Sequence, residues 1–294
     1  MGPREACPCG SGKRYKGCHG RQPAQDRQGV QRPFAGRVDE TEWIALREVV
    51  PAATAPLRVR AAPDREVLLS TLLPLAWPAL VRADARILLG LQVQSRSGDV
   101  SRDLAAALEL ALDAPPGSPV QPVGLPGPGP RLQDLLSEDP IEVTVHSGFD
   151  YWVEGAADPS GEVAASMERA NASVIPTARL SSVQSAYWCR MRAKTHLRWV
   201  LPEEEGPLLD AMARLAVARA LTVGPDSRYV GSFRAHGLLV PVWDLPHDRE
   251  PEQLEEPSLA LRARLDEELA APRPLTPEER RARSGLLSRQ LTLR

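Results

Sequence analysis

Four potential metal ligands lie within the first twenty residues of this chain of 294 residues. They form a C-x-C pair followed, after eight intervening residues, by an adjacent cysteine and histidine: Cys7, Cys9, Cys18 and His19. Three thiolates and one imidazole can surround a tetrahedral Zn²⁺ ion, and the glycines between them permit the tight turns that such a short loop needs. Adjacent residues of a strand point to opposite faces, so Cys18 and His19 share a metal only where a turn or a helix start redirects the chain.

The surroundings of this cluster favour metal ligation over a disulfide framework. The start of the chain lacks the apolar segment of a secretory signal, which predicts a reducing, cytosolic compartment for its four cysteines. Lys13, Arg14 and Lys16 would offset the negative charge that three thiolates leave around Zn²⁺. A chance cluster and a redox thiol pair are the alternatives.

The cluster resembles the SEC-C motif, a zinc-binding module best known from the C-terminal tail of the preprotein translocase motor SecA. The resemblance rests on the run Cys-Pro-Cys-Gly-Ser-Gly, then Tyr15-Lys16, then Cys-His-Gly20. It implies that Zn²⁺ binds to Cys7, Cys9, Cys18 and His19, and that the module docks protein partners. The motor itself is excluded, because Cys7 and Arg14 stand where a phosphate-binding loop requires a glycine and a hydroxyl residue.

The rest of the chain resembles an actinobacterial family of unknown function that carries a SEC-C motif ahead of a globular body. Six stretches carry this resemblance: Gln31–Phe34, Trp43–Pro51, Ser97–Leu104, His146–Phe149, Gly231–Gly237 and Pro241–Asp244. It implies no activity.

Composition and charge divide the chain further. We expect a zinc module over 1–20, a polar, basic linker over 21–37, two halves over 38–155 and 156–247, and C-terminal helices with a basic tail over 248–294. In residues 114–130, eleven of seventeen residues are proline or glycine, which predicts that regular structure does not continue through this stretch.

Apolar periodicity predicts an α+β body of two related halves, each a small sheet with helices. Helical spacing recurs near 43–50, 104–112, 163–170 and 208–216, and strand-like runs include 57–60, 66–72, 86–94, 141–146, 149–153, 177–183, 186–191, 195–201, 228–234 and 238–245. Pro241 predicts that the last of these strands lies at a sheet edge. Thr276-Pro-Glu-Glu279 is a capping box that predicts a short basic helix, with an end soon after Arg283.

Charge limits the classes of partner. The net charge of −2 and the pI near 6.3 argue against a broadly basic nucleic-acid binder. The two ends are nevertheless basic: residues 1–37 hold eight basic and two acidic side chains, and no acidic residue follows Glu279. These ends are solvated tails or a contact with RNA or the ribosome. The apolar, uncharged run from Val67 to Val81 is too short to span a membrane.

No catalytic constellation stands out. Cys189 with His196 and Asp210 invites a thiol-protease interpretation, but the strand pattern favours a buried, inert cysteine. His146, His196, His236 and His247 lack metal-ligand spacing, which favours hydrogen-bonded or surface histidines, and the six tryptophans are predicted to be core. We therefore expect a cytosolic zinc-binding adaptor with a protein partner; an enzyme of unrecognised class tagged by the zinc motif, and an RNA- or ribosome-associated protein, are the alternatives.

Overall fold

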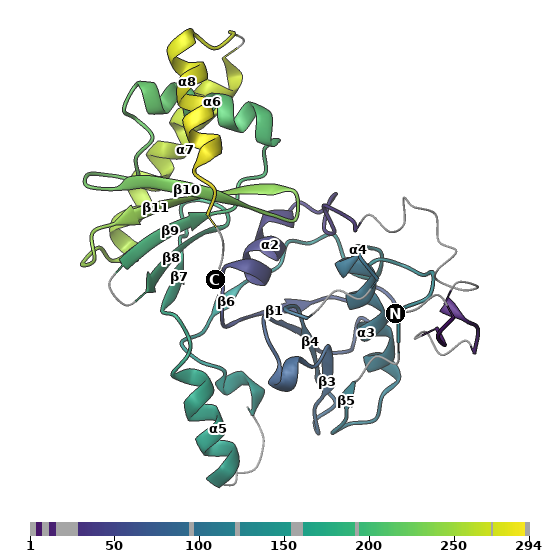
Figure 1. Cartoon of the computed structure of the whole chain (residues 1–294). Helices are drawn as coiled ribbons and strands as arrows, with labels where there is room; N and C mark the ends of the chain where they lie inside the picture. Colours follow the sequence, from purple (N-terminus) through teal and green to yellow (C-terminus); the bar gives the residue numbers. More distant parts are fainter. Residues whose placement is uncertain are drawn as a thin grey trace. The chain divides into compact units, whose positions relative to one another are not determined.

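The structure is a computed structural model that describes residues 4–7, 12–15, 29–93, 97–120, 124–153, 161–191, 194–271 and 273–291. The chain forms two compact units, Met1–Asp39 with Ala52–Ala172, and Glu40–Pro51 with Ser173–Arg294. Each unit has its own β-sheet and helices (Figure 1). The predicted α+β class is therefore confirmed.

The sheet of the first unit has the strand order β5-β3-β4-β2-β1-β6. The strands β2 and β4 pair in parallel, whereas the other neighbouring pairs are antiparallel. Their bounds are β1 (Ala53–Leu57), β2 (Val67–Ser70), β3 (Ala79–Val81), β4 (Ile87–Gly90), β5 (Pro119–Val120) and β6 (Thr144–Val145). The short helices of this unit are η3 (Pro74–Ala76), α4 (Leu132–Leu135) and η4 (Asp150–Trp152).

Helix α3 (Val100–Asp113) packs on the sheet of the first unit, next to β3, β4 and β5. Its buried stripe includes Leu104 and Leu108, as the apolar spacing predicts. The carboxylate of Asp99 caps the helix by accepting a hydrogen bond from the Ser101 amide at 3.0 Å. A further helix of this unit, α5, spans Gly161–Asn171, where the sequence also predicts one.

One predicted strand of the first unit is wrong. Residues 149–153 do not form a strand, because their aromatic rings pack together around η4: Phe149 stacks on Trp152 with ring centroids 4.4 Å apart. In the described part of the Pro/Gly-rich stretch 114–130, the two-residue strand β5 is the sole regular element, so regular structure does not continue through it, as predicted. Since β5 lies at the sheet edge, Pro119 needs to donate no hydrogen bond to an outer neighbour.

The sheet of the second unit is antiparallel throughout, in the order β10-β11-β9-β8-β7. The strands are β7 (Thr177–Arg179), β8 (Ala186–Met191), β9 (Lys194–Trp199), β10 (Arg228–Ala235) and β11 (Leu238–Leu245). Three helices share one apolar core with this sheet: α6 (Glu205–Val217), α7 (Glu255–Ala270) and α8 (Pro277–Ser288). A short helix, η5 (Pro251–Leu254), comes directly before α7. Trp199 and Trp243 lie at the centre of that core, with ring centroids 6.4 Å apart.

Helix α2 (Glu40–Glu48) belongs to the second unit although the strands that follow it in sequence belong to the first. Its Glu42 carboxylate is 3% exposed and accepts hydrogen bonds from the Arg179 guanidinium at 2.7 Å and the Tyr187 hydroxyl at 2.6 Å. Tyr187 points to the sheet face opposite its neighbour Trp188, which lies in the helix-covered core. Helix α2 therefore contacts the other face of this sheet.

In the C-terminal helix α8, the sequence predicts the start correctly but not the end. The capping box is confirmed: the Thr276 hydroxyl accepts from the Glu279 amide at 3.2 Å, and the Glu279 carboxylate accepts from the Thr276 amide at 2.7 Å. Helix α8 runs on through Gly285 to Ser288, so its predicted early end is wrong. Leu286, in this last part, is 4% exposed within the core, and that packing offsets the low helix propensity of glycine.

Pro241 lies in β11, which is an interior strand, so the predicted edge position is wrong. Pairing of β11 with β9 begins only at Val242. Position 241 therefore needs no amide hydrogen for β9, and an interior strand tolerates the proline there.

Residues 29–37, the described part of the expected linker, pack against the first unit. The Val30 amide donates to the Gly98 carbonyl at 2.8 Å, and Phe34 is fully buried. The Arg131 guanidinium donates a hydrogen bond to the Pro33 carbonyl at 3.0 Å. This segment is part of the folded body, because its polar groups find partners about a hundred residues away in sequence.

Candidate metal centre and a pocket in the first unit

Residues 4–7 and 12–15, which belong to the predicted metal module, pair with each other through one β-bridge. Ala6 pairs with Arg14 in an antiparallel bridge, flanked by hydrogen bonds from the Cys7 amide to Lys13 and from the Tyr15 amide to Glu5, each 2.8 Å long. Gly12 has a φ of +68°, a left-handed conformation that glycine adopts without strain. Cys7 stands at the end of the outgoing strand, and Tyr15 already has 3₁₀ backbone geometry.

The structure places one of the four predicted ligands. Cys7 is 5% exposed, whereas Cys9, Cys18 and His19 lie outside the described residues. Within the described ranges, no three His, Cys, Asp or Glu side chains are grouped so that they could hold a metal ion. The donor set of the sequence fits Zn²⁺, since three cysteines and a histidine are common ligands of structural zinc. The ligand assignment stays a prediction.

Cys189 does not have the surroundings of a nucleophile. It is 1% exposed, and burial raises the pKa of its thiol. His196 is its direct partner on β9, but the imidazole Nδ1 lies 2.9 Å from the Asp244 carboxylate. Asp210 instead accepts from the Arg283 guanidinium at 2.6 Å. The structure thus supports the buried, inert cysteine that the strand pattern predicts.

Two more of the histidines that the sequence predicts to be hydrogen-bonded or at the surface have side-chain partners. His146 Nε2 lies 2.8 Å from the Thr54 hydroxyl, and His236 Nε2 lies 2.8 Å from the Glu48 carboxylate. That bond to His236 lowers the pKa of Glu48, against the opposing effect of burial. Burial lowers the pKa of His196, with Asp244 opposing. Of the tryptophans, Trp77 and Trp152 are only half-buried, and the other four are core as predicted.

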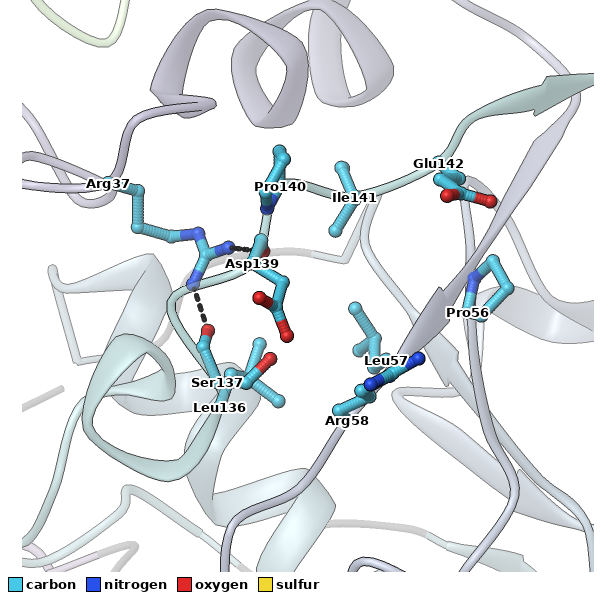
Figure 2. A pocket seen from close by; sticks show the side chains of 10 residues that line it. All are labelled: Arg37, Pro56, Leu57, Arg58, Leu136, Ser137, Asp139, Pro140, Ile141 and Glu142. Atoms are coloured by element: carbon cyan, nitrogen blue, oxygen red, sulfur yellow. Dashed lines mark hydrogen bonds between the residues drawn. The ribbon is translucent and has the colours of Figure 1, made fainter.

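A pocket of about 510 Å³ lies in the first unit, beside the free part of strand β1 (Figure 2). One wall is β1 and the residue after it, and the other is formed by residues 136, 137 and 139–142. Leu57, Leu136 and Ile141 supply apolar surface, while Arg58, Asp139 and Glu142 supply charge. No pattern in the sequence indicates this site, because neither wall carries a motif and the walls are about eighty residues apart.

The shape of this pocket is fixed by a buried ion pair between Arg37 and Asp39. Their side chains are 6% and 2% exposed, and Arg37 Nε lies 2.7 Å from the Asp39 carboxylate. Arg37 also donates to the carbonyls of Ser137 and Asp139 at 3.0 and 2.9 Å, and Asp39 accepts from the Ile141 amide at 2.8 Å. Three hydrogen bonds therefore tie the outer wall to the Arg37–Asp39 pair, and Figure 2 shows the two that Arg37 donates.

A search for membrane-spanning helices in the described part of the chain finds none that is both long and apolar enough. Comparison with curated proteins gives no match, and neither does comparison with solved structures. Two family profiles match: the SEC-C motif over residues 4–21, and the family of unknown function DUF5926 over residues 33–294. The second match spans most of the sequence. The protein therefore belongs to the DUF5926 family, with a SEC-C motif ahead of the family domain.

Proposed function

We propose that this protein is a zinc-binding interaction protein, in which the SEC-C module binds Zn²⁺ and a protein partner. The observation that carries the proposal is the match of residues 4–21 to that motif. The bridge between Ala6 and Arg14 supports it, because it places the basic residues Lys13 and Arg14 beside Cys7, whose amide donates to the Lys13 carbonyl. Cys7, Cys9, Cys18 and His19 are the proposed ligands.

The role of the metal in this proposal is structural. When bound, Zn²⁺ supplies four bonds that replace the apolar core which a segment of this length cannot build. Lys13 and Arg14 are exposed on the return strand. They would balance the thiolate charge and present a positive surface to the partner.

The test is partner capture with the full-length protein in three forms: loaded with zinc, treated with a chelator, and as the double variant Cys7→Ser/Cys9→Ser. The matched control is Cys189→Ser, which removes a cysteine from the body only. We expect a protein retained by the zinc-loaded chain and by the control, and lost from the chelated chain and the double variant. A protein retained equally by all four would contradict the proposal.

Binding of RNA is the second candidate, and the basic residues of 1–37 and of the C-terminal end support it. Phosphate contacts release counterions, so such binding weakens steeply as salt rises. An RNA pull-down repeated at 50 and 300 mM salt separates the two candidates: retention of RNA only at low salt favours contact through the basic ends.

A further inference from the structure

The pocket beside β1 exists because the edge of the first sheet opens. Strand β1 pairs with β6 at Ala53 and Thr54, and pairing with the same outer segment resumes only at Val59, opposite Leu136. Between these points, the inner strand has four residues, 55–58, and the outer segment has seven, 137–143. The longer side bows outward. Pro56 contributes to this opening, since it has no amide hydrogen to donate across the gap.

Backbone polar groups of β1 face into this opening. The Arg58 carbonyl accepts from the Ser137 amide at 2.9 Å, and the Arg60 amide donates to the Leu135 carbonyl at 2.9 Å. Even-numbered residues therefore aim their backbone groups at the outer segment, whereas Ala53 bonds to Thr71 on the β2 side. The Pro56 carbonyl and the Arg58 amide point the same way. Neither has a hydrogen-bond partner within the described residues.

Two exposed carboxylates border the same space. Asp139 projects from the outer segment and Glu142 lies beside Pro56 (Figure 2). Neither carboxylate forms a hydrogen bond or ion pair with the described residues. Arg58 forms no ion pair with the residues that the structure describes, whereas Arg37 is engaged with Asp39 and the outer segment. The unpaired side chains thus carry a net negative charge toward a ligand.

The combination identifies a ligand class. An acceptor and a donor on either side of Leu57 match the amide and carbonyl of an extended peptide, which would supply the missing ladder pair. The carboxylates match a protonated amine, and Leu57 and Ile141 match an apolar side chain. The volume of about 510 Å³ falls within the range of about 300–1000 Å³ that is usual for small-ligand sites.

We propose that this pocket binds a short extended peptide with a free amino terminus. The peptide main chain pairs with the Pro56 carbonyl and the Arg58 amide, and its amine binds the carboxylates of Asp139 and Glu142. Because ladder pairs close the opening at both ends, a short peptide or a chain end enters more readily than the middle of a long chain. The buried pair Arg37–Asp39 keeps the site open before the ligand arrives, which lowers the entropic cost of binding.

The test uses the full-length, isotope-labelled protein and the tripeptide Ala-Leu-Ala, with its N-acetylated form as a second ligand. We expect saturable changes of the backbone amide signals of Arg58 and of residues 137–142, and at least tenfold weaker binding of the acetylated peptide. The double variant Asp139→Asn/Glu142→Gln should weaken binding of the free peptide at least tenfold and leave binding of the acetylated peptide unchanged.

Glu138→Gln is the matched control, because Glu138 is an adjacent carboxylate on the same segment that is not part of the pocket wall. We expect this variant to bind both peptides as the wild-type protein does. The proposal is overturned if neither peptide changes these signals at millimolar concentration, or if acetylation and the double variant leave the affinity unchanged. Zinc content does not enter this experiment, so its outcome is independent of the proposed zinc function.

Discussion

The two parts of this chain that match family profiles differ in what can hold them together. Among residues 4–7 and 12–15, Cys7 is buried and Tyr15 is half-buried, while the other described side chains are exposed. The DUF5926 body buries Trp43, Trp199 and Trp243 to 1% exposure or less and surrounds them with apolar side chains. The body therefore folds on its own core, whereas the module, under the proposed function, would depend on bonds to a metal.

This comparison predicts that changes in the body lower its stability and leave the zinc content unchanged. The largest effect is expected for Trp243→Ala in the second unit. Trp243 is fully buried, its ring centroid lies 5.9 Å from that of Tyr229, and its Nε1 donates to the Leu221 carbonyl at 3.2 Å. Loss of such a side chain costs about 3–5 kcal/mol of unfolding free energy.

Urea unfolding of the full-length protein measures this cost. The control is Leu259→Ala, a truncation at a side chain of the same unit that is 55% exposed, which should change the unfolding free energy by no more than about 0.5 kcal/mol. Equal effects of the two truncations would show that the body does not rely on the tryptophan core.

The next effect tests how helix α2 is held on its sheet. Glu42→Gln keeps the side-chain size but removes the charge that receives bonds from Arg179 and Tyr187. Because Arg179 is 37% exposed and so partly screened, we expect a loss of about 2 kcal/mol in unfolding free energy. Glu267→Gln, at an exposed position of α7, should have little effect in the same urea titration. An unchanged stability for Glu42→Gln would show that packing alone holds α2.

A smaller effect is expected at the start of α8. Thr276→Ala removes the hydroxyl that accepts from the Glu279 amide, and loss of such a cap costs about 1 kcal/mol. Thr276→Ser keeps a hydroxyl and should restore most of the urea midpoint. If serine and alanine behave alike, the cap does not contribute to the stability of the body.

The smallest expected effect is the pH dependence of the stability that Glu279 contributes at the start of α8. The Arg273 guanidinium, followed by the Thr276 amide, lowers the pKa of Glu279 to about 2 from its ordinary value of 4.5. Since the folded-state pKa is the lower one, the stabilising contribution is present above the ordinary value and is lost as the pH falls toward 2. The difference in Tm between wild-type protein and Glu279→Gln should be constant above about pH 5.5 and shrink between pH 4.5 and 2. A difference that does not vary with pH would contradict this assignment.

Short stretches of the sequence predict several elements of this fold. The cap at Thr276 and the apolar stripe of α3 each depend on residues within a few positions of one another, so both are predictable. Pairings over long distances are not. The bonds from Arg37 to residues 137 and 139 and the interior position of Pro241 depend on which strands and segments become neighbours, and no spacing in the sequence records that.

The same distinction applies to the candidate sites. The predicted zinc ligands are close in sequence, and their residue types and spacing suffice to predict a metal site. The pocket beside β1 instead combines residues 56–58 with residues 136–142 through a strand edge that opens at Pro56. In the same way, His196 contacts Asp244 on the neighbouring strand, whereas Asp210 is bound to Arg283. The sequence alone does not indicate which of the two aspartates is the partner of His196.

Elemental analysis of the purified, reduced full-length protein tests the central claim most directly. It would be measured beside Cys7→Ser/Cys9→Ser and the control Cys189→Ser, with the urea midpoint of the body recorded for each. We predict about one zinc per chain in the wild-type protein and the control, and a loss of zinc with an unchanged body midpoint in the double variant. Absence of zinc from the wild-type protein, presence of iron in its place, or equal zinc in all three proteins would contradict the claim.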